Sequence, residues 1–338
     1  MNYSLVIFVS LFVGFLVGLM GLDLRIGQAE DKTTAVSFDP SPHESTLKVG
    51  ADWMQGLDGQ IQLSQLSIPG THDTCALLNG FSFGFAKCQS WSLSSQLEAG
   101  IRFLDIRCRH RSNRFEIYHG VIDQKISFTE VLEVCVEFLE THPGECLLMS
   151  VKEESKAEQV SRSFKETFEE EIKNYRDLWV LNSRKVNLDQ ARGKIVLLDR
   201  VGNLGGLSWS HMSKQDDYQA LPDVKKERIT QQFDRTDQGD PDQWFLNYSS
   251  GTVPRQLLNP AAYASQVNPF VLEEVSKRKG KRLGVVIMDF PGDELLQSII
   301  NRNQSFLKSK SKSKSKSKPE RSKPERSKPE PSKQDAKP

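Results

Sequence analysis

The sequence predicts an α/β fold in which strand–helix units close into a parallel barrel of the TIM type, regular or irregular. Two observations predict it. Short β-type runs alternate with helical patterns along the middle of the chain. Polar residues also come at the ends of several of these runs, where barrels build their sites. Of the 338 residues, both ends look non-globular, which leaves about one domain of roughly 100–250 residues. We therefore expect a single barrel domain.

Residues 1–29 have the features of an export signal. The stretch from Leu5 to Leu22 is apolar apart from Ser10 and a few glycines, and residues 27–29 are of the kind that precedes signal cleavage. The run also reaches the ~18–20 residues that span a bilayer, and no Lys or Arg precedes it. We expect a cleaved signal peptide and a secreted or extracellular protein; a retained N-terminal membrane anchor is the alternative.

Residues 30–50 are polar, contain two prolines and show no apolar period, so they predict a linker. The folded domain is expected over residues 51–307. Its β-type runs are Leu66 to Pro69, Ile101 to Cys108, Phe115 to His119, Cys146 to Lys152, Lys194 to Arg200, Gln243 to Tyr248 and Arg282 to Phe290.

Two helices of the outer ring are predicted in detail. Ser127 and Glu130 form a capping box that starts the first, apolar residues follow at helical spacing, and Pro143-Gly144 ends it. The second is expected from about Glu154 to Tyr175. Its apolar stripe comprises Val160, Phe164, Phe168 and Ile172.

Residues 308–338 form a low-complexity Ser/Lys/Pro tail with twelve Lys or Arg and four Asp or Glu. The formal net charge of +1 for the whole chain therefore combines +8 in the tail with −7 elsewhere. Such a composition predicts disorder, because it buries too little apolar surface to offset the entropy of ordering. The tail either attracts anionic lipid, at about 1 kcal/mol per Lys or Arg near a charged membrane, or only solubilises the chain.

Five cysteines are too few for a disulfide scaffold, and their spacing fits no zinc pattern. We therefore expect no metal bound through sulfur. Two interpretations stay open. Either Cys75 and Cys88 bridge a short loop, or all five cysteines, including Cys108, Cys135 and Cys146, are buried small side chains.

Two of the six histidines lie beside strong strand and turn signals. His72 stands in Ser67-Ile-Pro-Gly-Thr-His-Asp-Thr74, and His119 stands in Ile117-Tyr-His-Gly120. Because the pKa of imidazole is near 6.5, one such ring can act as a base and another as an acid at neutral pH. Together they predict proton transfer, as in the attack of a neighbouring hydroxyl on a phosphodiester; the structural alternative for each is a histidine that only packs.

Strand alternation places Phe103, Asp105 and Arg107 on one face of their run. In a barrel this face looks inward, so Arg107 is expected at the mouth, where a guanidinium can grip phosphate oxygens. An Arg107–Asp105 ion pair that only fills the barrel is the alternative. In the last run the same alternation puts Asp289 on one face with Val285 and Ile287. Asp289 ends this run and is placed to orient a histidine, since a carboxylate on one ring nitrogen stabilises the imidazolium.

The ordered set of motifs resembles the bacterial-type phosphatidylinositol-specific phospholipases C, the X-domain phosphodiesterases. The resemblance covers about residues 51–307. The matching motifs are Ser-Ile-Pro-Gly-Thr-His-Asp73, Gly100-Ile-Arg-Phe-Leu-Asp-Ile-Arg107, Tyr118-His-Gly, Met149-Ser-Val-Lys152 and Val286-Ile-Met-Asp289.

The resemblance implies a role for each matching residue. His72, oriented by Asp289, would be the general base that deprotonates the inositol 2-hydroxyl. Arg107 would bind the phosphate, and His119, paired with Asp73, would protonate the departing diacylglycerol oxygen. The implied products are diacylglycerol and an inositol cyclic phosphate.

The resemblance also implies headgroup contacts from Lys152, Arg200, Asp216 and Tyr218, the last two through the short match Gln215-Asp-Asp-Tyr218. Lys152 and Arg200 end their runs, so structural strand ends are the alternative for these two.

Calcium-dependent eukaryotic members of the family carry an acidic ligand where Arg107 stands and an amide where Asp73 stands. The cation at position 107 therefore implies that this chain uses no metal and no other cofactor. The implied partner is a phosphoinositide or inositol-anchor lipid at a membrane surface, contacted peripherally by a monomer, with no nucleic acid.

Aromatic residues Phe81, Phe83, Phe85 and Trp91 lie between the first two strand signals. We interpret them as an apolar rim that dips into lipid; for Trp91 and the residues after it, a core-facing helix start is the alternative. Two other functions remain for comparison. One is a metal-dependent glycerophosphodiester or sphingolipid phosphodiesterase on a similar barrel, and the other is an inactive inositol-lipid binding module.

Overall fold

In the computed structural model, residues 37–41, 50–183 and 185–308 are described. The predicted export signal, nearly all of the basic tail and most of the predicted linker lie outside these residues. Within the described part of the chain, no helix is both long enough and apolar enough to cross a membrane. A compact unit ends at Leu307.

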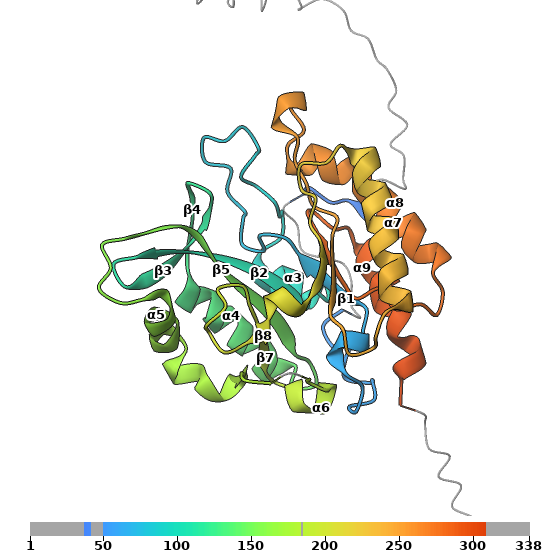
Figure 1. Ribbon diagram of the computed structural model, residues 1–338, viewed down its shortest axis with the longest axis horizontal. Coiled ribbons are helices and arrows are strands. Elements are labelled where there is room, and N and C mark those ends of the chain that lie inside the picture. The colour runs from blue at the N-terminus through green and yellow to red at the C-terminus, as the bar shows by residue number, and fades with distance from the viewer. Residues whose placement is uncertain (1–36, 42–49, 184, 309–338) are drawn as a thin grey trace, which may run out of the picture. The chain divides into compact units, whose positions relative to one another are not determined.

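One curved sheet forms the centre of this unit, with the α-helices packed along its outer side (Figure 1). Along the described chain its strands are β1 (Ile68–Thr71), β2 (Phe103–Arg111), β3 (Arg114–His119), β4 (Ile122–Ser127), β5 (Leu147–Glu158), β6 (Trp179–Val180), β7 (Ile195–Asp199), β8 (Leu207–Ser208), β9 (Ser213–Gln215), β10 (Phe245–Tyr248) and β11 (Val285–Met288).

The main path of the sheet runs β6-β7-β5-β2-β1-β11-β10-β9, and every pair along it is parallel. β8 also pairs with β7 in parallel. Among the described strands no ladder joins β8 to β9, which are linked directly through the short helix η3 (Trp209–His211). The predicted TIM-type parallel barrel is therefore confirmed in its irregular form, as a sheet that curls without closing by hydrogen bonds.

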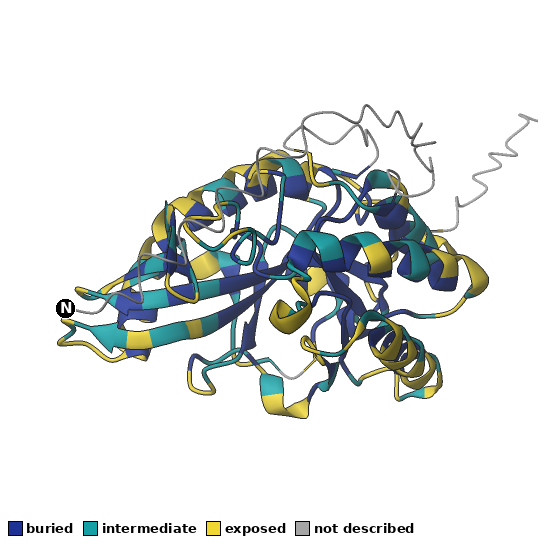
Figure 2. Cartoon of the chain, turned by 90° about the horizontal axis from the view of Figure 1, so that it is seen from above, coloured by how far each residue is buried: buried dark blue, intermediate teal, exposed yellow. Residues whose placement is uncertain are grey.

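The helices connect successive strands and bury the outer face of the sheet (Figure 2). They are α3 (Leu93–Glu98), α4 (Phe128–Thr141), α5 (Phe164–Glu171), α6 (Leu188–Ala191), α7 (Pro222–Gln238), α8 (Pro260–Lys277) and α9 (Asp293–Ile300), with short turns η1 (Leu63–Gln65), η2 (Lys173–Leu178), η4 (Pro254–Gln256) and η5 (Asn301–Phe306).

Two apolar clusters pack against the sheet, one on each face, as strand alternation predicts. Leu104 and Ile106 of β2 pack in the cluster that contains the helices, whereas Phe103 packs in the inner cluster with Val285 and Ile287 of β11. Six residues that precede β1 also lie in the inner cluster: Trp53, Met54, Leu57, Ile61, Leu63 and Leu66. The inward-facing positions of β2 and β11 were thus predicted correctly.

The third predicted run forms β3, but it is not a parallel βα unit. It pairs antiparallel with β2 and β4 in an arm that extends from the sheet. The turn between β2 and β3 consists of Ser112 and Asn113, whose φ angles of 50° and 59° suit a two-residue hairpin turn. A parallel partner needs a crossover of a dozen or more residues, which this turn excludes.

The helix expected from Glu154 to Tyr175 was wrong at its start. β5 continues to Glu158, because its outer half pairs with the extended end of β2 as far as Arg111. Ladder pairing overrides the local helical pattern here. Helix α5 begins only after the capping box of Ser163 and Glu166, whereas the box of Ser127 and Glu130 starts α4 as predicted.

All five cysteines are buried and free. The bridge between Cys75 and Cys88 is therefore wrong, and the interpretation as buried small side chains is confirmed.

Candidate active site

The C-terminal ends of the parallel strands surround a cavity of about 390 Å³. His72 directly follows β1, Asp289 directly follows β11, and Arg200 directly follows β7. Eight of the nine predicted site residues line the cavity, and the ninth, Asp73, lies buried behind it. The full lining is His72, Phe85, Arg107, His119, Lys152, Glu154, Arg200, Asp216, Tyr218, Gly251, Thr252, Pro260 and Asp289.

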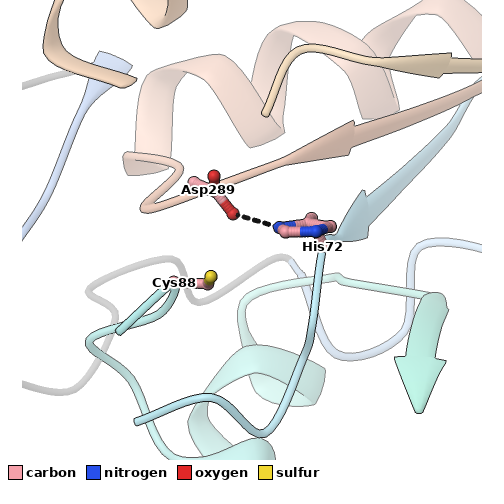
Figure 3. A group of neighbouring side chains, drawn as sticks. All are labelled: His72, Cys88 and Asp289. Atoms are coloured by element: carbon pink, nitrogen blue, oxygen red, sulfur yellow. Dashed lines mark hydrogen bonds and ion pairs between the residues drawn. The ribbon is translucent and has the colours of Figure 1, made fainter. Parts of the chain in front are cut away.

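The first histidine is paired with a carboxylate from the neighbouring strand. β1 and β11 are in parallel register with Thr71 opposite Met288, so the next residue of each strand, His72 and Asp289, meets the other. His72 Nδ1 lies 2.9 Å from Asp289 Oδ1 (Figure 3). The Asp289 side chain is 1% exposed and that of His72 is 15% exposed, so the pair is largely shielded from water while the ring still reaches the cavity.

The other nitrogen of His72 accepts a hydrogen bond from Arg107. An Nη2 atom of Arg107 lies 2.6 Å from His72 Nε2, and a guanidinium can only donate. The ring proton is therefore on Nδ1, where Asp289 accepts it. Burial, followed by the charge of Arg107, lowers the pKa of His72 well below 6.5. His72 is thus held as a neutral imidazole whose Nε2 lone pair is occupied by Arg107, and the ring can act as a base at the cavity once Arg107 turns away.

The second histidine also pairs with a carboxylate. His119 stands at the end of β3, and its Nδ1 lies 2.7 Å from Oδ2 of the fully buried Asp73. Asp73 leaves β1 with a φ of 41°, a left-handed conformation that aspartate adopts more readily than most residues. Its backbone N–H donates to Asp105 Oδ2 at 3.2 Å. The two His–Asp pairs therefore come from separate strand ends yet open into one cavity.

Arg107 lies between these pairs. Its guanidinium is 3.2 Å from Asp105, 3.5 Å from Asp73 and 3.6 Å from Glu154. Burial alone would lower the pKa of Arg107, but these carboxylates outweigh burial and raise it well above its usual value. The Arg107–Asp105 pair exists, but Arg107 also lines the cavity, so the pair does not only fill the barrel.

Asp105 connects two cations of the site. It is fully buried, and its Oδ1 accepts from Arg200 at 2.8 Å while Oδ2 accepts from Arg107. Burial would raise the pKa of Asp105, but Arg107 and Arg200 hold it well below its usual range. The Arg200 guanidinium also stacks over Trp209 at 4.6 Å. This carboxylate thus fixes both guanidiniums in place.

The remaining predicted residues form the outer part of the cavity. Lys152 on β5 pairs with Glu154 at 2.7 Å. Asp216 and the 52% exposed Tyr218 follow β9 and line the same cavity. The short match that placed these two at the mouth is therefore consistent with the structure.

Several residues of the site were not predicted. Glu154 lies two residues after Lys152 on the same strand, so its position on the inner face could have been found by alternation. Gln89 and Cys88 lie in the loop between β1 and α3, where no periodic signal exists. Tyr248, buried on β10, packs its ring edge-on to His72 at 6.3 Å.

Beside the cavity, the loop after β1 carries exposed aromatic side chains. Phe81 is 78% exposed and Phe83 is 93% exposed, while Phe85 lines the cavity. Trp91, by contrast, is buried in the core just before α3. The first three residues are placed as an apolar rim requires, and for Trp91 the core-facing alternative is correct.

Comparisons with known proteins agree with this geometry. Residues 60–201 match the family model described as phosphatidylinositol-specific phospholipase C, X domain. A 1-phosphatidylinositol phosphodiesterase of Listeria monocytogenes is 34% identical over 279 residues, covering 75% of this chain and 84% of the relative. One from Staphylococcus aureus is 26% identical, covering 77% of this chain and 96% of the relative.

Solved structures give the same result. The phosphatidylinositol-specific phospholipase C of Listeria monocytogenes superposes with a TM-score of 0.66 at 32% identity, covering 75% of this chain and 99% of its own. A Staphylococcus aureus phosphatidylinositol-specific phospholipase C superposes with a TM-score of 0.70 at 25% identity, covering 77% of this chain and 100% of its own. The chain therefore belongs to the phosphatidylinositol-specific phospholipase C family.

Proposed function

We propose that this phospholipase C cleaves phosphatidylinositol, or a glycosylated inositol lipid, without a metal cofactor. One observation carries the proposal: two His–Asp pairs and one arginine open into a single cavity at the ends of the strands. Each element of that arrangement fits one requirement of an attack by the inositol 2-hydroxyl on phosphorus.

In the first step the 2-hydroxyl loses its proton to Nε2 of His72 as its oxygen bonds to phosphorus. The proton already on Nδ1 stays between His72 and Asp289, and the carboxylate stabilises the imidazolium that forms. Arg107 now donates to His72 Nε2, so its guanidinium has to turn from that nitrogen to the phosphate oxygens when substrate binds. There it stabilises the charge that develops in the transition state.

His119 completes the reaction by giving a proton to the diacylglycerol oxygen as its bond to phosphorus breaks. Asp73 holds the Nδ1 side of the ring, which leaves Nε2 free for the leaving group. One P–O bond forms and one breaks, and the proton taken by His72 balances the one given by His119. The products are diacylglycerol and inositol cyclic phosphate.

Charge at the phosphate is supplied by the protein itself. Arg107 occupies the centre of a group of carboxylates, Asp73, Asp105 and Glu154, in which a bound cation would otherwise be stabilising. Among the described residues, the groups able to hold an ion both include Cys88, and a thiol is unsuited to Ca²⁺ or Mg²⁺, which prefer oxygen. These features favour a guanidinium over a catalytic metal.

Phosphorus NMR of the products from phosphatidylinositol tests this proposal. We expect an inositol cyclic phosphate signal in EDTA as strong as that without EDTA. If EDTA abolishes turnover, the metal-dependent diesterase is the better interpretation. Binding of inositol lipid without turnover, unaffected by His72→Ala, would instead establish an inactive binding module.

We also propose that the enzyme acts as a secreted monomer that contacts membranes peripherally. The apolar segment over residues 5–22 supports secretion, and the exposed Phe81 and Phe83 beside the cavity support the membrane contact. N-terminal sequencing of protein recovered from the culture medium tests secretion. A mature chain that begins after Ala29 is expected; a chain found only in the membrane fraction with residue 1 intact favours the anchor.

A further inference from the structure

Cys88 lies where the two His–Asp pairs approach each other, and the proposed reaction does not use it. Its side chain is fully buried in the loop between β1 and α3, with Sγ 3.6 Å from His119 Nδ1. The ligand atoms of Asp73, Cys88 and His119 all lie within 4.8 Å of one another, as do those of His72, Cys88 and Asp289. Figure 3 shows the sulfur beside the Asp289–His72 pair.

A thiol, an imidazole and a carboxylate form a ligand set typical of zinc, which binds Cys, His and Asp with an open fourth position in catalytic sites. Hard cations such as Ca²⁺ favour oxygen ligands alone. We propose that Cys88, His119 and Asp73 form an inhibitory site for one soft divalent cation of the Zn²⁺ class.

The distances suit such an ion. Around tetrahedral zinc, bonds of about 2.3 Å to sulfur and about 2.05 Å to nitrogen place these two atoms about 3.6 Å apart. Cys88 Sγ and His119 Nδ1 are 3.6 Å apart. His119 Nδ1 and Asp73 Oδ2, now 2.7 Å apart in an ion pair, would move to about 3.4 Å apart when the ion lies between them.

Charge and access also favour the site. Asp73 is fully buried, and Oδ2 of Asp289 nearby has no hydrogen-bond partner among the described residues. Burial, followed by the charge of Asp73, raises the pKa of Asp289 well above its usual value. A divalent cation would add positive charge where these carboxylates lie. Arg107 opposes this from 3.5 Å, but its charge is already shared with Asp105 and Glu154. His119 is 23% exposed, so water can reach the fourth position.

Occupancy of this site would stop the reaction at the leaving-group step. On binding, the thiol proton of Cys88 and the Nδ1 proton of His119 go to solvent. The metal-bound ring no longer becomes an imidazolium, so its Nε2–H is too weak an acid to protonate the diacylglycerol oxygen. Asp73 would also bind the ion and would no longer pair directly with His119.

Binding can be tested without substrate, with Cd²⁺ as the probe, because a Cd²⁺–thiolate bond gives an ultraviolet charge-transfer band. We expect one bound ion and one band per chain in the wild type and in the control Cys135→Ala, which removes another buried, free cysteine on α4. Cys88→Ala should lose the band. Inhibition by Zn²⁺ should be reversed by EDTA, and Cys88→Ala should need at least about tenfold more Zn²⁺ for equal fractional inhibition.

The same band in Cys88→Ala, or none in the wild type, would overturn the proposal. Asp73→Asn provides a second variant of nearly equal size, and it should weaken Cd²⁺ binding at least about tenfold. Equal weakening by Asp289→Asn but not by Asp73→Asn would refute the assignment to His119 and Asp73. Because the band is read without turnover, these results stand whether or not the proposed reaction is confirmed.

Discussion

At the scale of single residues, the chemistry of this site depends on which nitrogen of each histidine ring carries a proton. His72 receives a hydrogen bond from Arg107 on Nε2 and gives one to Asp289 from Nδ1. His119 Nδ1 lies 2.7 Å from Asp73 Oδ2 and 3.6 Å from Cys88 Sγ. In the proposed reaction, these different neighbours assign opposite tasks to two chemically identical side chains.

The division of tasks predicts how the two alanine variants respond to the leaving group. His72→Ala and His119→Ala should each slow cleavage of phosphatidylinositol by about 10²- to 10⁴-fold. On an inositol aryl phosphate, whose phenolate leaves without a proton, His119→Ala should recover most of its activity, whereas His72→Ala should not. Initial rates on both substrates measure this. Equal losses for His119→Ala on the two substrates would contradict its role as the acid.

The lowered pKa of His72 predicts the pH profile. The base works when neutral, so activity rises with pH through its pKa, and a lowered pKa places this ascending limb of kcat/KM below pH 6.5. Arg107→Met removes one of the two main causes of the lowering, so the limb should move to higher pH. Arg107→Met should also reduce kcat/KM by about 10²- to 10³-fold, which is the usual effect of removing one hydrogen-bond donor to the charge that develops in a transition state.

Arg109→Met is the matched control for this experiment, because Arg109 lies two residues further along β2 and pairs with Glu158 instead of the site. It should leave the limb in place. If the ascending limb of kcat/KM lies at the same pH in Arg107→Met as in the wild type, Arg107 does not set the pKa of His72.

At the scale of elements, the two strand ends that carry His72 and Asp289 are held together by one buried glutamine. Gln89 donates to the carbonyl oxygens of His72 at 2.7 Å and Met288 at 3.0 Å, and its own oxygen accepts from the N–H of Phe290. Phe290 has a φ of 44°, which is uncommon for a bulky residue. Such a conformation costs about 1–3 kcal/mol and persists only where its surroundings enforce it.

Gln89→Leu should therefore lower both stability and catalysis. The carbonyl of Met288 keeps the N–H of His72 as its donor, but the carbonyl of His72 loses the donor that Gln89 supplies. The loss of that hydrogen bond costs about 1–3 kcal/mol of unfolding free energy, measured by urea denaturation. Displacement of His72 relative to Asp289 should reduce kcat by about 10²-fold under conditions where the protein stays folded.

Gln232→Leu is the control, because Gln232 is also buried and bonds the carbonyls of Ser213 and Leu246, away from the histidines. Gln232→Leu should lower the free energy of unfolding and leave kcat unchanged. If Gln89→Leu behaves in the same way, Gln89 has no positioning role.

At the scale of the whole molecule, the cavity and the apolar rim are properties of one end of the barrel. The loop with Phe81 and Phe83 projects at the top of Figure 1, as does the segment around η4 with the 81% exposed Leu257. Large exposed apolar side chains grouped beside an active site are typical of a surface that meets lipid.

Replacement of Phe81 and Phe83 by Ser should weaken binding to phosphatidylinositol vesicles by at least about tenfold. Burying one such side chain contributes about 1.5–3 kcal/mol, and about 1.4 kcal/mol is a tenfold change in affinity. Turnover of a soluble inositol phosphodiester should be unchanged. Vesicle sedimentation measures the binding, and Leu307→Ser, an exposed apolar residue at the end of the compact unit, is the control. Unchanged vesicle binding would remove the rim from the proposal.

Local sequence patterns were sufficient to predict much of the fold and of the candidate site. Alternation placed Arg107 and Asp289 on inward-facing positions, a capping box located the start of α4, and the ordered motifs identified the family and the nine residues that the structure brings together. These features depend on residues close in sequence, or on strands whose parallel register brings successive C-terminal ends to one mouth.

Only the tertiary structure decided the rest. β3 is antiparallel to its neighbour β2, and β5 extends beyond its predicted end. Cys88 and Gln89 contact the two histidines from a loop whose sequence shows no apolar period. Each of these outcomes depends on pairing or burial between segments distant along the chain. Such contacts leave no local period in the sequence, because the free energy that selects them comes from the partner segment.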